Sequence, residues 1–169
     1  MLSGATGQLY GNGYTWGIND RHWKQHFDTP AVNQLGLMAK LFRSLPWQDL
    51  VPDQDHTILT DGFGSYDSGG DVLDNAYATA AATADGSLVV VYVPTARTIQ
   101  LDRSRLKPGL VAEWFDPTNG ERRPASQPFT TPGKNSAGDQ DWVFIAKTST
   151  SPTHPRRNQT SGRTTDQPS

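Results

Sequence analysis

Residues 76–94, AYATAAATADGSLVVVYVP, carry the clearest signal of the fold. Two runs of small and β-branched residues flank the pair Asp85-Gly86, and an Asp-Gly pair between such runs is a strong short-range signal for a β-hairpin. We therefore predict one strand on each side of this pair, and a sheet as the basis of the domain.

Further strands are predicted on the C-terminal side of the hairpin. RTIQLDRSRL, at 97–106, alternates Ile99 and Leu101 with polar neighbours. LVAEWFDPTNGE, at 110–121, is a strand closed by a turn in which Pro117 presets φ and Gly120 accepts a positive φ. The last strand, DWVFIAK, has two faces: Trp142, Phe144 and Ala146 opposite Val143 and Ile145.

Several short strands at this spacing, with no helix between them, predict a small antiparallel β-sandwich over residues 49–147, so the fold class is mainly β. In the 110–121 strand, either Trp114 or Phe115 faces the sandwich core, because neighbouring side chains alternate between the two faces. We expect the outward ring of the two to be buried against the segment that precedes the sandwich.

Residues 1–48 contain one amphipathic helix, predicted over Pro30 to Leu45. Pro30 suits its first turn, Thr29 or Asp28 is the expected N-cap, and Pro46 ends it. Its apolar stripe recurs at steps of three and four: Val32, Leu35, Met38, Leu41, Phe42 and Leu45. One helix, with a helix end and a short strand before it, cannot enclose a core, so we expect residues 1–48 to dock on the sandwich.

Residues 148–169 carry no large apolar side chain and are predicted to form a disordered tail. The net charge of −2 provides no long-range attraction for nucleic acid or for an anionic membrane, so neither is an expected partner. There are no cysteines, which excludes disulfides and thiol chemistry. The first residues do not have the pattern of a secretory signal peptide.

Four glycines lie near the start of the sequence, at positions 4, 7, 11 and 13, and glycine-rich segments can bind phosphate. Their spacing fits neither a dinucleotide-binding fingerprint nor a P-loop. Metal signals are equally weak. His22 and His26 lack the Glu of an H-E-x-x-H motif, and the three aspartates of YDSGGDVLDN, Asp67, Asp71 and Asp74, miss the calcium-loop pattern. We therefore predict no metal and no cofactor.

Several segments of the sequence resemble segments of one known family. SGATGQLYGNGYTW, at 3–16, resembles the Ser-Gly-Ala-x-Gly-x-x-Tyr-Gly run of apiosidase-like glycoside hydrolases, where it spans a helix end, the last strand of a (β/α)8 barrel and the loop that follows. LPWQDLVPD, at 45–53, resembles that family's linker, and VVVYVP, AEWFDPTNGE and DWVFIAK resemble its C-terminal β-domain, which carries the label "putative collagen-binding domain of a collagenase".

The resemblance implies three parts: a C-terminal remnant of a barrel at 1–48, the β-domain at 49–147, and the tail at 148–169. It implies that Met1 is not the start of a folded unit, and that the chain is the C-terminal part of a secreted, extracellular or periplasmic protein of bacterial type. The partners it implies are a polysaccharide or glycan, bound through the missing barrel, and the rest of the parent chain. The alternative is a module that binds collagen or carbohydrate.

The resemblance places one wall of a sugar site after the last barrel strand, at Tyr10, Asn12, Tyr14 and Trp16. Aromatic rings stack on sugars and an amide satisfies hydroxyls, although these rings serve equally well to pack a barrel rim. No catalytic residue is assigned. The only glutamates, Glu113 and Glu121, lie in or beside a sandwich hairpin and not at the end of a barrel strand. We therefore expect no catalysis from this piece alone.

Overall fold

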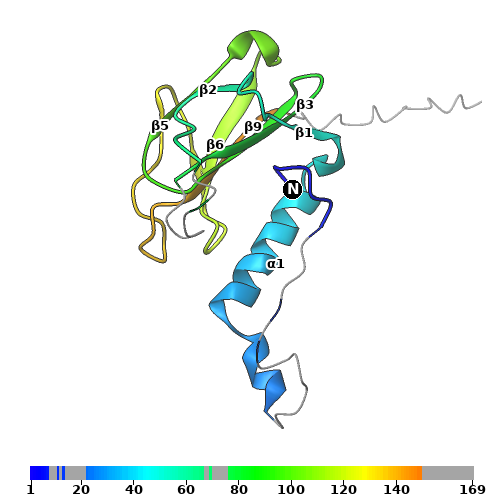
Figure 1. The fold of residues 1–169 in the computed structure, drawn as a ribbon, viewed down its shortest axis with the longest axis vertical. Coiled ribbons are helices and arrows are strands. Elements are labelled where there is room, and N and C mark those ends of the chain that lie inside the picture. The colour runs from blue at the N-terminus through cyan, green and yellow to red at the C-terminus, as the bar shows by residue number, and fades with distance from the viewer. Residues whose placement is uncertain (8–10, 12, 14–21, 67–68, 70–75, 150–169) are drawn as a thin grey trace, which may run out of the picture.

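The described residues fold as two antiparallel sheets and one α-helix, shown in Figure 1 as a computed structural model. The structure describes residues 1–7, 11, 13, 22–66, 69 and 76–149. The elements are η1 (Trp23–Phe27), α1 (Pro30–Arg43), η2 (Trp47–Asp49), β1 (Leu50–Pro52), β2 (Leu59–Asp61), β3 (Thr79–Thr83), β4 (Leu88–Val93), β5 (Thr98–Leu101), η4 (Arg103–Arg105), β6 (Leu110–Phe115), β7 (Arg122–Pro124), β8 (Phe129–Thr130) and β9 (Trp142–Thr148).

The larger sheet has the strand order β1-β3-β4-β9-β6-β7 and is antiparallel throughout. The predicted hairpin lies at its centre: β3 and β4 pair with Ala82 opposite Val89, and Gly86 of the turn has a φ of +68°. The smaller sheet has the order β2-β5-β8. The mainly β, sandwich-like prediction is confirmed.

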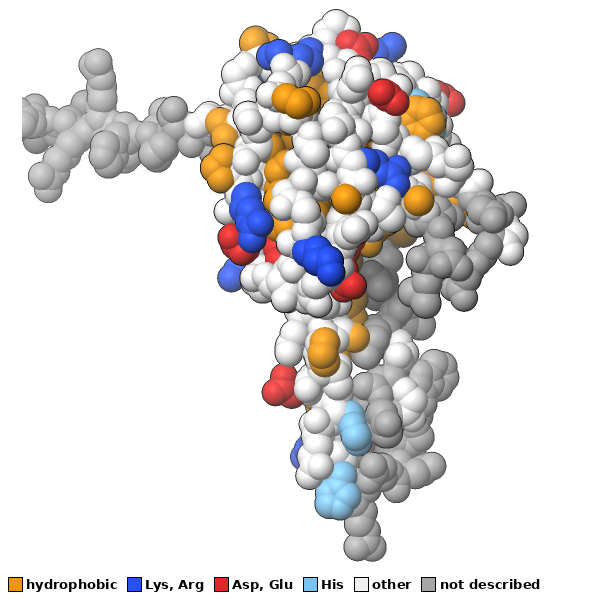
Figure 2. All heavy atoms as spheres, turned by 90° about the vertical axis from the view of Figure 1, so that its left-hand side faces the viewer, with side chains coloured by type: hydrophobic (Ala, Val, Ile, Leu, Met, Phe, Trp, Pro, Cys, Tyr) orange, Lys and Arg blue, Asp and Glu red, His pale blue; other side chains and the backbone are white. Residues whose placement is uncertain are grey.

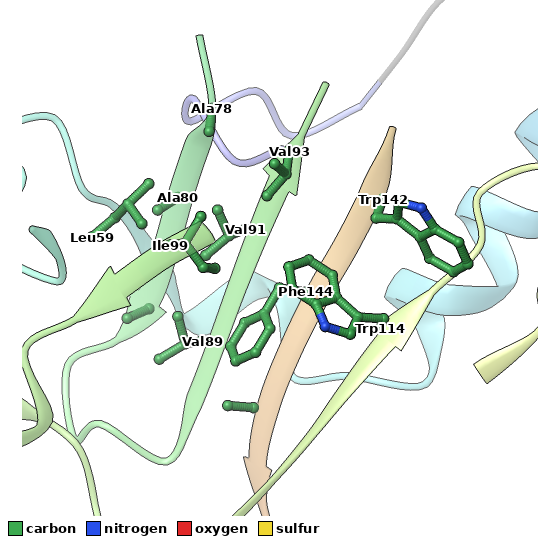
Figure 3. Packing of buried hydrophobic residues seen from close by; sticks show 12 residues of the cluster. Leu59, Ala78, Ala80, Val89, Val91, Val93, Ile99, Trp114, Trp142 and Phe144 are labelled. Carbon is green, nitrogen blue, oxygen red and sulfur yellow. The ribbon is translucent and has the colours of Figure 1, made fainter. Parts of the chain in front are cut away.

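The main core lies between the two sheets (Figure 3). Alternate residues of β4 and β9 point into it, because side chains on a strand change face at every step. Val91 and Phe144 from the large sheet pack there with Ile99 of the small sheet, and all three are at most 1% exposed. Trp114 supplies an edge-to-face contact with Phe144 at 5.2 Å between ring centroids. Of Trp114 and Phe115, Trp114 is therefore the residue whose ring faces the sandwich core.

Helix α1 covers part of the other face of the large sheet. Thr29 caps it by accepting a hydrogen bond from the Val32 N–H at 3.4 Å, and Pro30 occupies its first turn, as predicted. The last turns meet the outward side chains of the sheet in a second cluster: Leu41, Leu45, Leu88, Val90, Phe115 and Ile145. The expected docking and the burial of the outward ring, Phe115, are both confirmed. In Figure 1 the N-terminal end of α1 points away from the sheets.

Three features differ from the expectations. Helix α1 ends at Arg43, with Ser44 as its C-cap, and not at Leu45 before Pro46. The segment that resembles a linker contains β1, which pairs with β3 from Leu50 opposite Thr83 to Pro52 opposite Ala81, so it is an edge strand of the large sheet. Residues 2–4 form a turn and not the end of a helix. The expected barrel strand within residues 8–21 and the tail from residue 150 lie outside the described residues, and the boundary at 48/49 stays a prediction.

Candidate functional site: a cleft between the helix and the large sheet

A cleft of 710 Å³ opens where α1 diverges from the large sheet. Its helix wall includes Leu35 and Met38, which are half-buried members of the apolar stripe. Its sheet wall includes Tyr92 and Val143, on the face of β4 and β9 that points away from the main core. The cleft exists because only the C-terminal turns of α1 are pressed onto the sheet, which leaves the earlier part of the stripe beside an open space.

The polar residues that line the cleft include Tyr92, Asp139 and Asp141. The Tyr92 hydroxyl donates a hydrogen bond to Asp141 Oδ2 at 3.2 Å. Burial, together with the negative charge and hydrogen bond of Asp141, raises the pKa of Tyr92 to about 12. Burial also raises the pKa of Asp141, and this outweighs the opposing effect of the Tyr92 hydrogen bond. Tyr92 is therefore a neutral hydrogen-bond donor at physiological pH, and Asp141 accepts its hydrogen bond.

The buried carboxylate of Asp116 ties the loop after β6 to the loop before β9. It accepts hydrogen bonds from the Thr118 N–H at 2.8 Å and the Thr118 hydroxyl at 2.5 Å. It also accepts from the N–H and the hydroxyl of Ser136, both at 2.8 Å. Burial alone raises the pKa of Asp116, but these bonds together hold the pKa below its ordinary value. Thr118 lines the cleft, so Asp116 positions that part of its wall.

Asn135 holds the loop that carries the two cleft carboxylates. Its side-chain oxygen accepts from the N–H groups of Ala137 and Asp139, each at 3.0 Å. Its amide group donates to Asp141 Oδ1 at 2.7 Å. Trp142 anchors the same loop, because its indole N–H donates to the Gly133 carbonyl at 2.8 Å. Both Asp141 oxygens are thus engaged, one by Asn135 and the other by Tyr92.

The cleft therefore combines an apolar wall with a small number of fixed hydroxyl and carboxylate groups. Such a surface suits an apolar segment edged with hydrogen-bond donors. The two glutamates are elsewhere and already paired: Glu113 with Arg122, and Glu121 with Arg123 at 3.1 Å. The face shown in Figure 2 mixes acidic and basic side chains, with no broad patch of one sign over the sheets.

The predicted wall of a sugar site, Tyr10, Asn12, Tyr14 and Trp16, lies outside the described residues, as do Asp67, Asp71 and Asp74. His22 and His26 flank and enter η1, where the Gln25 amide lies 3.4 Å from His22 Nδ1. Within the part of the chain that the structure describes, no group of three or more metal-ligating side chains could hold a metal ion. No helix of that part is long and apolar enough to cross a bilayer.

Sequence reasoning missed the cleft. One signal was present: in VVVYV, Val91 and Val93 face the core, so Tyr92 between them has to lie on the outer face. Its partner Asp141 is far away in the sequence, and nothing local links the two.

Two of the comparisons with known proteins found matches. A protein-family model described as "Putative collagen-binding domain of a collagenase" matches residues 70–147. A solved structure named "Glycoside hydrolase" is similar with a TM-score of 0.55 and 25% identity over 76% of this chain. A family 5 glycoside hydrolase from Bacteroides vulgatus has a TM-score of 0.51 and 24% identity over 75% of this chain, which is a likeness of fold.

The chain spans only 28% of the first of these structures and 26% of the second. A search of curated proteins gave no match. The chain thus resembles a collagen-binding-like domain and a minor part of larger glycoside hydrolases, and a (β/α)8 barrel of the apiosidase-like kind stays a prediction.

Proposed function

We propose that this chain is the accessory β-domain of a larger carbohydrate-active protein, extracellular or periplasmic, which acts on polysaccharide through a catalytic domain outside these residues. The observation that carries the proposal is the cleft. Leu41 and Leu45 seal α1 onto the sheet, whereas Leu35 and Met38 remain half-buried beside Tyr92. A half-covered apolar stripe next to fixed polar groups is the kind of surface that a neighbouring domain covers.

The similarity to glycoside hydrolases supports this role, because the aligned part is a minor fraction of each larger chain. The bonding of both glutamates and of Asp141 supports the absence of catalysis in this piece. Hydrolysis of a glycosidic bond needs one carboxyl group to transfer a proton and a second to attack or to activate water. Glu113 and Glu121 are bound to arginines, and Asp141 is held at both oxygens.

The test compares the 169-residue chain with the product of its whole gene, including any coding sequence that precedes residue 1. Hydroxyl-radical footprinting would measure the reactivity of Met38 and Tyr92 in both proteins. We expect both residues to be protected in the longer protein, while Val111, which is 56% exposed on β6, reacts equally in the two. We also expect glycosidase activity only in the longer protein.

Three results would overturn the proposal. One is a gene with no coding sequence ahead of residue 1. A second is equal reactivity of Met38 and Tyr92 in the two proteins. A third is turnover of aryl glycosides or pectic fragments by the 169-residue chain that Asp141→Asn abolishes.

A further inference from the structure

An aromatic cluster lies apart from the cleft, where the chain between β1 and β2 meets the segments that follow β2 and precede β3. We define it as His56, Phe63, Tyr66 and Tyr77. His56 stacks on Phe63 with ring centroids 3.8 Å apart and planes 14° from parallel. Tyr77 lies edge-on to His56 at 5.8 Å, and Tyr66 lies edge-on to Tyr77 at 5.7 Å. The rings form a continuous series from His56 to Tyr66.

The backbone at His56 is held in an unusual conformation. His56 has a φ of +52°, which residues with a Cβ rarely adopt. The Asp53 carboxylate maintains this turn by accepting from the N–H groups of Thr57, Ile58 and Leu59 at 2.7–3.1 Å. Non-glycine residues in this region persist only where the surroundings enforce them, and they concentrate at functional sites.

The ring of His56 is bound at one nitrogen only. The Tyr77 hydroxyl lies 3.0 Å from Nε2, whereas Nδ1 is buried and has no hydrogen-bond partner within the described residues. A buried polar atom without a partner lowers stability, and such an atom in a folded protein calls for an explanation. Stacking on Phe63 and the contact with the Tyr77 hydroxyl hold the ring of His56 between these two aromatic residues.

Two glycines bring the chain from β2 to Tyr66 along a fixed path. Gly62 has a φ of +80°, and a Cβ there would lie 2.3 Å from the Thr98 carbonyl oxygen. Gly64 has a φ of +74°, and a Cβ there would lie 2.5 Å from Nη1 of Arg97. The Arg97 guanidinium donates to the Gly62 carbonyl at 3.1 Å, and the Ala78 N–H donates to the Phe63 carbonyl at 2.8 Å. The segment that ends at Tyr66 is thus fixed from both sides.

Tyr66 is the exposed end of the series. It is 68% exposed, more than any other large hydrophobic residue in the described part of the chain. We propose that Tyr66, positioned by Tyr77, His56 and Phe63, is a stacking platform for one sugar ring of a glycan. The choice of a glycan as the ligand rests on the proposed role in a carbohydrate-active protein.

The size and setting of the ring favour a glycan over a protein partner. Protein interfaces need an apolar patch of several hundred Å² with further anchors around it. Among the described residues, Tyr66 follows Gly64 and Ser65, has the ring of Tyr77 as its aromatic neighbour, and does not line the cleft. A tyrosine presents an apolar face to the C–H side of a sugar and a hydroxyl to its polar edge, and it loses little conformational freedom on binding.

The experiment is affinity electrophoresis of the 169-residue chain in native gels that contain soluble xylan, pectin or hydroxyethyl-cellulose. We expect at least one of these polysaccharides to retard the protein. Tyr66→Ala should lower the association constant about tenfold or more, the effect of truncating an aromatic anchor. Tyr66→Trp should keep the binding because it keeps a stacking ring.

Phe27→Ala is the matched control, because Phe27 is also an exposed aromatic residue, at 50%, but lies on η1 far along the chain from the cluster. It should bind as the unchanged protein does. Circular dichroism would verify that each variant is folded.

The proposal is overturned if none of the three polysaccharides retards the protein, or if Tyr66→Ala binds as well as the unchanged protein. It is also overturned if the chain binds a triple-helical collagen peptide through Tyr66 and binds no polysaccharide, since the platform would then serve a protein ligand. All of these results concern the 169-residue chain alone. The proposed docking of a neighbouring domain is tested separately, by the footprinting of Met38 and Tyr92.

Discussion

Replacement of Asp116 by alanine removes the carboxylate that joins the loop after β6 to the loop before β9. Its four hydrogen bonds, to the N–H and hydroxyl groups of Thr118 and Ser136, would all be lost. The two hydroxyl groups can turn toward water, but the two N–H groups are held in place by the backbone. The loss of stability therefore comes mainly from the backbone donors.

Each hydrogen bond to a charged acceptor is worth about 1.5–3 kcal/mol, and the cost of burying the Asp116 charge offsets part of this. We expect Asp116→Ala to lower the free energy of unfolding by about 2–4 kcal/mol. For a chain of 169 residues, each kcal/mol corresponds to a fall in Tm of about 2–4 °C. Asp116→Asn keeps the shape but retains one acceptor oxygen, so its effect should be smaller than that of alanine.

Urea unfolding at neutral pH, followed by tryptophan fluorescence, measures this loss. Trp114 and Trp142 are buried in the main core, at 2% and 0% exposed, so their emission reports the loss of packing. The two variants should unfold at lower urea concentration with an unchanged m-value. A loss below about 1 kcal/mol for Asp116→Ala would refute the reasoning, because it would show that water replaces these bonds at little cost.

The same carboxylate predicts a dependence on acid. Its pKa is lowered in the folded protein, so its contribution to stability is complete above the unfolded pKa of about 3.9 and is lost as the pH falls through the lower folded value. The difference in stability between the unchanged protein and Asp116→Asn should therefore shrink below about pH 4. A difference that stays constant down to pH 2 would contradict this assignment.

Three further outcomes are expected. Leu45→Ala should cost about 2–4 kcal/mol in urea unfolding and speed proteolysis within α1, because Leu45 is 6% exposed in the cluster that holds the helix to the sheet. Gly62→Ala should lower the Tm and the yield of folded protein, because its Cβ would lie 2.3 Å from the Thr98 carbonyl oxygen in the β2–β5 region. Spectrophotometric titration should show a tyrosine with a pKa of about 12, and Asp141→Asn should lower it by removing a negative charge, although burial keeps it above the ordinary value.

Matched controls separate these effects from general damage. Val111→Ala alters a side chain that is 56% exposed and should change stability by less than about 0.5 kcal/mol. Gly133→Ala introduces a Cβ with no atom within 4 Å at a φ of +93°, so it tests backbone strain without a steric clash. If Gly133→Ala were as damaging as Gly62→Ala, strain alone would explain both. If Asp141→Asn left the pKa of Tyr92 unchanged, burial alone would account for its value.

The local elements could be predicted from the sequence. The Asp85-Gly86 turn, the alternation in DWVFIAK and the capped apolar stripe after Thr29 each depend on residues within a few positions of one another, and short-range periodicity and turn chemistry are sufficient to predict them. The presence of a sandwich followed from the number and spacing of such strands. The predicted sugar-site residues, Tyr10, Asn12, Tyr14 and Trp16, lie outside the described residues and stay a prediction.

Which faces of these elements meet depends on the assembled fold. Alternation showed that Trp114 and Phe115 point to opposite sides, but the inward side depended on how the two sheets and α1 stack. The same is true of Tyr92, which meets Asp141 across 49 positions, and of His56, which meets Tyr77 across 21. These contacts form when distant strands pair and exclude water together, and no local pattern encodes that choice. The cleft and the aromatic cluster therefore became visible only once the sheets and the helix were assembled.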